Sequence, residues 1–205
     1  MNLKTLSFFI AGVLGGILIL GSVRFVLAVE DPDNVHYHAN WALVVDGERV
    51  DFTADRYMED VAACVADAHH LDARARVHLH DNDMDVVHVH HRGVTWGHFL
   101  ANLGWGLGPD WLMTDEGELY QAGDGGNFVF VVDGWVVGRL DDRVIDPGAR
   151  VLIYWGREDP DRVAEEYFPQ VAANAVEYDL LDDPGGCGAA QEPGLGDRLR
   201  RALLY

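Results

Sequence analysis

The sequence predicts an α+β domain that has a small, mostly antiparallel sheet and short helices, preceded by one N-terminal transmembrane helix. Three observations lead to this fold class. An uncharged apolar run lies near the N-terminus. Short runs of strand-forming residues then alternate with Asp-Gly and Pro-Gly turns. A helical spacing of apolar residues recurs before the middle of the chain and again towards its C-terminus.

The apolar run extends from Leu6 to Val23 and contains 18 residues without a charge, the lower limit for a membrane-spanning helix. Lys4 precedes it and acidic residues follow it within positions 30–33, so the positive-inside rule predicts a cytoplasmic N-terminus and an extracytoplasmic remainder, periplasmic or at the cell surface. Residues 1–28 are therefore predicted to form a membrane anchor or a signal segment. An uncleaved anchor is favoured over cleavage after Val26-Leu27-Ala28.

The first half of the domain combines strands with two short helices. Alternation from His36 to Val45 predicts a strand that ends at the Asp46-Gly47 turn. Three- and four-residue apolar spacing predicts a helix over 55–68, and residues 76–80 and 86–91 form a predicted hairpin. A further helix is expected from Thr95 to Leu103, because Thr95 is a suitable N-cap.

The second half alternates strands and turns before it becomes helical. Strands are predicted at 111–113, 119–121, 128–132, 135–137 and 151–155. A helical pattern over 161–180 is broken near Pro169, and a Gly/Pro-rich tail follows. We therefore divide the exported part into a His-rich α+β domain at 29–156 and a helical extension with its tail at 157–205.

Composition limits the partners of this domain. The chain has 34 Asp and Glu residues against 15 Lys and Arg, a net charge of −19. This balance argues against nucleic acid and against anionic lipid surfaces as partners, since both need a basic surface. The chain has two cysteines, Cys64 and Cys187. An exported domain permits them to form a disulfide, and two unpaired thiols are the alternative. The sequence contains no CxxC motif that would indicate a redox centre.

Histidine is the residue with a pattern. Three His-x-His pairs occur, and residues two apart on a strand project from one face. A hairpin loop of Asn82-Asp83-Met84 would place His78 opposite His88 and bring all four hairpin imidazoles to one face, whereas a two-residue turn would split the pairs. The six paired residues are His36, His38, His78, His80, His88 and His90.

Clustered imidazoles of this kind are typical ligands of Zn, Cu, Ni and Fe. We predict that His78, His80, His88 and His90 bind a Cu or Zn ion, with His36 and His38 next in line. His98 could approach from the end of the hairpin, and His69-His70 are expected at the surface. A proton-sensing cluster without metal and a merely polar strand face are the alternatives. Residues 81–92 do not form an EF-hand, because Val86 and Arg92 replace the required Gly and Glu.

These residues predict an extracytoplasmic metal-binding protein that captures or delivers Cu or Zn. A zinc hydrolase or lyase, with three His ligands and an activated water, is one alternative. No Glu lies close to the cluster in the sequence to act as a base, so an enzyme is less favoured. A non-catalytic envelope module whose His face senses pH is the other alternative.

The segments HYHANWALVVDGERVDF and VHLHDNDMDVVHVHHRGVTWGHFLANLGW carry a resemblance. Together they are similar to a group of uncharacterised bacterial membrane-anchored extracytoplasmic proteins with HxHA and HLHD…HVHxxGVTxGxF motifs. The resemblance covers residues 36–155 and implies co-occurrence of the motifs, with no activity attached. Separately, FVFVVDGWVVGRLDDRVIDPGARVLIYWG looks like the end of a β-grasp domain, which makes β-grasp the first expectation for the fold.

Overall fold

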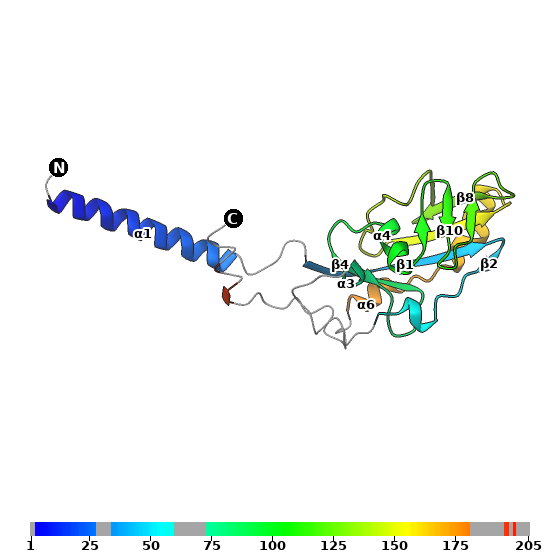
Figure 1. Cartoon of the computed structure of the whole chain (residues 1–205), viewed down its shortest axis with the longest axis horizontal. Helices are drawn as coiled ribbons and strands as arrows, with labels where there is room; N and C mark the ends of the chain where they lie inside the picture. The colour runs from blue at the N-terminus through cyan, green and yellow to red at the C-terminus, as the bar shows by residue number, and fades with distance from the viewer. Residues whose placement is uncertain (1–2, 28–33, 60–72, 181–194, 197–198, 200–205) are drawn as a thin grey trace. The chain divides into compact units, whose positions relative to one another are not determined.

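A computed structural model describes residues 3–27, 34–59, 73–180, 195–196 and 199, in two separate units (Figure 1). The first unit contains α1 (Leu3–Leu27), whose apolar stretch Lys4–Val26 has a mean hydropathy of 2.3. At about 1.5 Å per residue this stretch exceeds the roughly 30 Å hydrocarbon core of a bilayer. The predicted apolar helix is thus confirmed as one long enough to cross a membrane, and a signal sequence would have the same length and composition.

The second unit is built on a mixed sheet, which confirms the predicted α+β class. Its strand order is β3-β4-β1-β10-β8-β9, and β2 (Glu48–Arg49) pairs with the end of β1. The central pair, β1 and β10, is parallel, whereas β3–β4, β10–β8 and β8–β9 are antiparallel. The strands are β1 (Asn34–Val45), β3 (Val77–His78), β4 (Val86–His91), β8 (Asn127–Val132), β9 (Trp135–Val137) and β10 (Arg150–Gly156).

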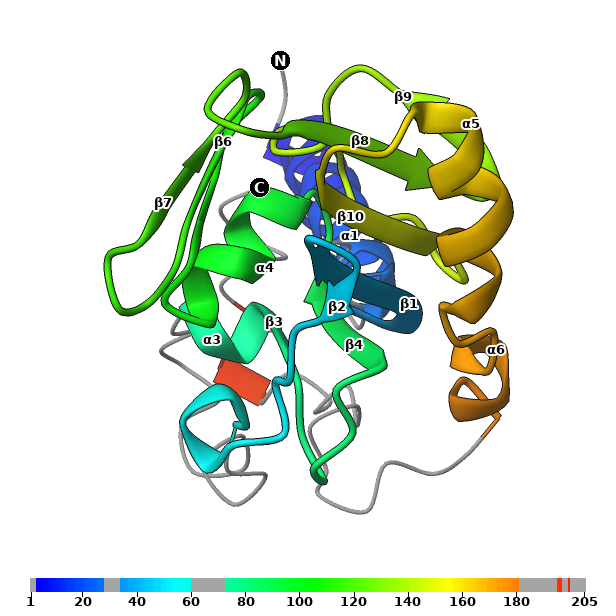
Figure 2. The same ribbon diagram turned by 90° about the vertical axis from the view of Figure 1, so that its right-hand side faces the viewer.

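Alternate residues of β1 supply two different cores. Ala39, Trp41 and Leu43 point to one face and pack in a cluster that includes Phe99 and Leu100 of α4 (Trp96–Asn102). The residues between them reach the opposite face, where Ala42 and Val44 join a smaller cluster with the segment after β10. Figure 2 shows α4 on one side of the sheet and the α5–α6 segment on the other.

The helix α4 forms where the sequence predicts it. The Thr95 hydroxyl accepts a hydrogen bond from the His98 amide, and the Thr95 amide donates to His98 Nδ1, so that both residues form a capping box. Trp96, Phe99 and Leu100 are buried at helical spacing. Gly104 follows with φ +82°, a conformation that a helix end favours in glycine.

Hairpins of the second half also match the prediction. Beside the main sheet lies a small antiparallel sheet of β5 (Gly106–Leu107), β6 (Trp111–Met113) and β7 (Leu119–Gln121). The Asp133-Gly134 turn has positive φ at both positions, as a two-residue hairpin loop requires, and the Asp46-Gly47 turn of the first half has the same form.

The helix predicted over 55–68 is wrong where it can be checked. Asp55–Tyr57 form a single 3₁₀ turn, and Met58 is extended and bridges to Leu79 beside β3. Tyr57 is buried against Phe52, so the chain follows the sheet instead of continuing as a helix. Residues 60–72, with Cys64 and His69-His70, lie outside the described residues, as does Cys187; the possible disulfide therefore stays a prediction.

The segment after β10 is helical and broken, as predicted, but in shorter pieces. It comprises α5 (Pro160–Arg162), a π-helical turn at Val163–Tyr167, a 3₁₀ turn at Phe168–Gln170 and α6 (Ala175–Tyr178). The Arg150 guanidinium donates to carbonyls of Phe168, Pro169, Val171 and Ala172, which ties the broken stretch to the first residue of β10. The domain boundaries at 28/29 and 156/157 stay predictions.

Candidate metal centre

All six paired histidines lie on one face of three neighbouring strands. His78 is the Cα partner of His88 across β3 and β4. On the other side of β4, His38 Nε2 lies 2.9 Å from His88 Nδ1, and the rings of His36 and His90 stack with centroids 4.8 Å apart. From His36 to His38 the residue number rises along β1, while the contacted residue changes from His90 to His88 on β4, so these two strands are antiparallel. We refer to the six residues together as the histidine face.

The loop between β3 and β4 begins with a tight turn. Asp81 and Asn82 have φ of 59° and 57°, and the Asp83 amide donates to the His80 carbonyl at 3.1 Å. These are the features of a type I′ turn, in which Asn and Asp tolerate the left-handed conformation. Asp83 to Asp85 follow this turn before β4 begins at Val86, so the whole loop has an odd number of residues and His78 pairs with His88. The predicted register and the shared face of the two hairpin pairs are confirmed, but the loop is Asp81 to Asp85 and not Asn82-Asp83-Met84.

The histidine face is buried to an unusual degree for polar side chains. His38, His78, His80, His88 and His90 each expose 6% or less of their surface, and His36 is partly buried. Within the described residues, His80 Nε2, His88 Nε2 and both ring nitrogens of His90 have no hydrogen-bond partner. Buried polar atoms are almost always paired in proteins, so these nitrogens are open to a ligand that would pair them.

Two of the rings are held in a fixed tautomer. His78 Nδ1 lies 2.8 Å from the Arg74 carbonyl, and His80 Nδ1 lies 2.9 Å from a carboxylate oxygen of Asp81. Carbonyl and carboxylate oxygens accept only, so in both rings Nδ1 carries the hydrogen and Nε2 carries the lone pair. Histidines that bind metals show this arrangement, because the bonded N–H orients the ring.

A third ring is oriented through a relay that starts at Asp179. The carboxylate of Asp179 accepts from His38 Nδ1 at 2.6 Å, although the two residues lie 141 positions apart. His38 Nε2 must then be the acceptor of its 2.9 Å contact with His88 Nδ1, which leaves the lone pair of His88 on Nε2. His38 thereby orients His88, and both of its own nitrogens are occupied.

One group of three residues has the spacing of a metal site. His36, His88 and His90 each offer a ring nitrogen, and these nitrogens lie within 4.8 Å of one another. A tetrahedral ion with bonds of about 2.0–2.1 Å holds its nitrogen ligands about 3.3 Å apart, so small ring rotations would close the group around an ion.

Burial keeps these rings neutral. Desolvation is the largest cause that lowers the pKa of His88 far below its usual range, and the charges of His80, His38 and further neighbouring histidines act in the same direction. Burial likewise lowers the pKa of His90 to about 2. A neutral imidazole keeps the lone pair that a metal ion needs, and a proton therefore competes weakly for His88 and His90.

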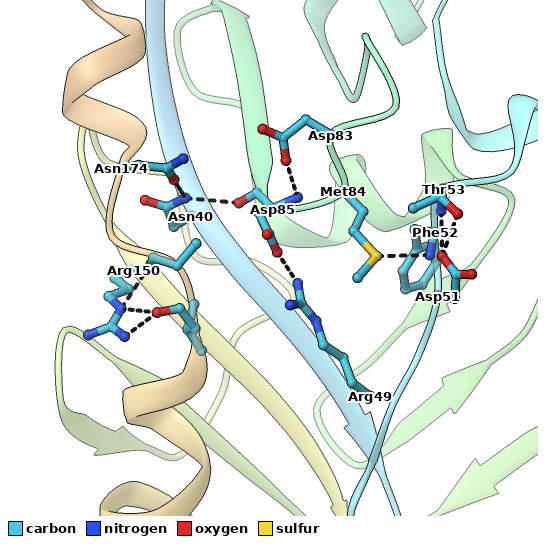
Figure 3. Close-up of polar contacts among 12 residues, drawn as sticks. Asn40, Arg49, Asp51, Phe52, Thr53, Asp83, Met84, Asp85, Arg150 and Asn174 are labelled. Carbon is cyan, nitrogen blue, oxygen red and sulfur yellow. Dashed lines mark hydrogen bonds and ion pairs between the residues drawn. The ribbon is translucent and has the colours of Figure 1, made fainter.

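The segment before residue 180 covers part of this face, which sequence reasoning missed. Asn40, next to the histidines on β1, donates to the Asp85 carbonyl and to the Asn174 side chain, and Figure 3 shows it between them. The Tyr178 ring lies 5.7 Å from that of His38, and its hydroxyl donates to Asp83 at 2.6 Å. This hydrogen bond, followed by burial, raises the pKa of Tyr178 to about 12.

Other histidines do not join the face. His98 is exposed and serves the α4 capping box, so the expectation that it approaches the hairpin site is wrong. His91 Nδ1 lies 2.8 Å from the Arg92 carbonyl, and His91 projects from the opposite side of β4. No signal near Asn174, Tyr178 or Asp179 in the sequence marks them as neighbours of the hairpin.

Comparisons with known proteins do not assign a function, so a functional proposal depends on the geometry of the site. A scan against protein-family models finds no match, and searches of curated proteins and of solved structures find none either. The resemblance drawn from the His motifs therefore stays an expectation.

Proposed function

We propose that this protein binds a transition-metal ion, Cu or Zn, through His36, His88 and His90, and captures or delivers that ion at the extracytoplasmic face of a membrane. The observation that carries the proposal is the group of ring nitrogens that these three histidines bring within 4.8 Å of one another. Among the described residues, His88 Nε2 and both ring nitrogens of His90 are buried without a hydrogen-bond partner. Nitrogen donors of this kind suit both ions.

The donor set favours a bound metal over a proton sensor. A sensor needs an imidazole whose pKa lies near physiological pH. The pKa values of His88 and His90 are lowered well below that range, because their surroundings exclude water and hold further imidazoles. A metal ion, in contrast, satisfies several lone pairs at once and needs no protonation of the buried rings.

Two further features support capture or delivery outside the cytoplasm. The helix α1 would hold the domain at a membrane, and the net charge of −19 would raise the local concentration of cations. Treatment of intact cells with a protease tests the location. Digestion of the domain in intact cells is the expected result, and protection until the membrane is opened would contradict it.

A zinc hydrolase is the second candidate, because three His ligands leave a fourth coordination position open to water. Cobalt substitution separates the two functions. An absorption spectrum that changes with pH and with added anions would indicate an exchangeable water and favour the enzyme. A spectrum insensitive to both would favour capture or delivery.

Elemental analysis of the full-length chain, purified without a His-tag or a nickel column, tests metal binding itself. We expect bound Cu or Zn in the wild type and its loss in a His36→Ala, His88→Ala, His90→Ala triple variant. His91→Ala is the matched control, since it removes an imidazole from the same strand but from the other side. Absence of metal from the wild type, together with no binding of added Cu or Zn, would overturn the proposal.

A further inference from the structure

The candidate metal centre is closed to an ion that arrives from solvent. His88 is 2% exposed and His90 is 6% exposed, so a hydrated cation cannot contact both rings unless some part of the chain moves. Both residues lie on β4, which is hydrogen-bonded to β3 on one side and to β1 on the other, so movement of the strand itself would break the sheet. Entry and release of an ion therefore require movement of a segment that lies against the histidine face.

The end of α6 lies against this face from outside the sheet. The Tyr178 ring is 5.7 Å from that of His38 and 6.1 Å from that of His88. The next residue, Asp179, accepts hydrogen bonds from both the backbone amide and Nδ1 of His38, at 3.1 and 2.6 Å. Two consecutive residues of this segment are therefore in contact with His38, which in turn contacts a predicted ligand, His88.

Hydrogen bonds, with little apolar burial, hold this segment in place. Within residues 174–180, Ala175 is buried, whereas Val176 is 60% exposed and Leu180 is 84% exposed. The Ala175 amide donates to the side-chain oxygen of Asn40 at 2.8 Å. Segments that bury little apolar surface open at a lower free energy than the core of a domain. Residues 174–180 are therefore suited to local opening.

The chain just before this segment is held more firmly. Val171 is 2% exposed, and the Arg150 guanidinium donates to carbonyls from Phe168 to Ala172. Ala173 is exposed and follows the last of these carbonyls. The boundary between firmly and weakly held chain thus lies close to Ala173, so residues 174–180 can move without loss of the Arg150 contacts.

A chain of hydrogen bonds connects a predicted ligand to this segment. His88 Nδ1 donates to His38 Nε2, and His38 Nδ1 donates to Asp179. An ion on Nε2 of His88 would withdraw electron density from the ring and make its N–H a stronger donor, and successive hydrogen bonds polarise one another. Linkage is reciprocal, so an ion that strengthens the attachment of the segment is also bound more tightly when the segment is attached.

We propose that residues 174–180 form a flap that opens to admit or release the ion and closes over the histidine face when the ion is bound. This inference rests on the proposed function, which supplies the ion. Opening breaks the hydrogen bonds of Tyr178 to Asp83 and of His38 to Asp179, and closing restores them. A buried centre can then retain its ion and still pass it on, as capture and delivery require.

The rate of metal release is the first test. Tyr178→Phe removes the hydroxyl that bonds to Asp83 but leaves the aromatic ring and every histidine in place. We expect the full-length variant, loaded with Zn²⁺, to release the ion to excess chelator about 3–10 times faster than the wild type, because one hydrogen bond fewer holds the flap closed. Tyr120→Phe removes a hydroxyl from β7 of the small sheet and should release Zn²⁺ at the wild-type rate. Unchanged or slower release from Tyr178→Phe would overturn the flap.

Hydrogen–deuterium exchange tests the closing step in the unaltered full-length chain. The amides of Glu177, Asp179 and Leu180 donate to carbonyls of the same segment, so their exchange reports its opening. Saturation with Zn²⁺ should slow exchange in a peptide over 174–180 more than in a peptide that contains β7. Zn²⁺ binding by calorimetry without this difference would overturn the flap and leave the proposed function intact. A wild type that binds neither Zn²⁺ nor Cu²⁺ would remove the proposed function as well.

Discussion

The two faces of β1 make a direct comparison, because the same strand supplies both. On one face Ala39, Trp41 and Leu43 are almost fully buried among apolar neighbours. On the other, His36, His38 and Asn40 come first, and only beyond them do Ala42 and Val44 meet an apolar core. Burial of apolar surface stabilises a fold, whereas burial of unpaired nitrogens costs free energy. The first face therefore holds the domain together, and the histidine face is retained at the expense of stability.

The largest effect should come from the apolar face. Trp41 is 1% exposed and contacts Phe52 and Phe99, so Trp41→Ala leaves a large cavity. We expect the free energy of unfolding to fall by about 3–5 kcal/mol, measured by urea denaturation. Trp135→Ala is the control, because Trp135 is 77% exposed and its truncation should change stability by less than about 0.5 kcal/mol. Equal losses in both variants would break the comparison.

A bound ion should offset the loss of stability that comes from burying the unpaired nitrogens of the histidine face. With free Zn²⁺ at 100 times its Kd, the folded state should gain about 2.7 kcal/mol per site, since the ion binds the folded chain. Thermal unfolding with Zn²⁺ and with a chelator measures this gain. The His36→Ala, His88→Ala, His90→Ala variant should show no such shift. If Zn²⁺ stabilised this variant as much as the wild type, the ion would bind outside these three histidines.

Loss of the relay should weaken metal binding without emptying the face. Asp179→Asn removes the charge that holds the hydrogen on His38 Nδ1, and through His38 the tautomer of His88. Metal affinity should fall about 10–100-fold. Calorimetric titration with Zn²⁺ measures this, with Glu177→Gln as the control because Glu177 is exposed on the short helix that ends just before Asp179. Unchanged affinity would show that the relay does not orient a ligand.

Acid should lower the stability of the metal-free protein, because the buried rings of His88 and His90 are neutral in the folded state. The pKa values of His88 and His90 are lowered in the folded state, so the unfolded chain binds more protons below its own pKa of about 6.5. Stability contributed by these neutral rings is present above pH 6.5 and is lost as the pH falls towards their folded pKa values, by about 1.4 kcal/mol per pH unit for each ring. Denaturation curves between pH 7 and 5 check the slope, and His90→Leu should reduce it by one ring. If the free energy of unfolding depends on pH with the same slope in the wild type and in His90→Leu, His90 does not contribute to the pH dependence.

Local patterns predicted much of this architecture, while distant contacts did not follow from them. The alternation in β1 and the Thr95 cap are local, and each gives the element expected of it. The loop after His80 gives the expected register through a different turn, at Asp81-Asn82. The place of β1 beside β4 depends on pairing between distant segments, so His36 could only be ranked behind the hairpin residues. Asp179 lies 141 residues from His38, and nothing near it in the sequence indicates that contact. The helix expected at 55–68 gives way at Met58, where pairing with Leu79 overrides local spacing.

The parallel pairing of β1 with β10 has a consequence for when the metal centre can exist. A parallel pair cannot close as a hairpin, so the strand near the start of the domain waits for one synthesised near its end. Asp179, which orients the inner ligands, follows later still. A chain that ends before Asp179 thus has the His-x-His pairs without the carboxylate that orients His38 and, through it, His88. The fully oriented centre would therefore form only after Asp179 has been synthesised and has reached His38.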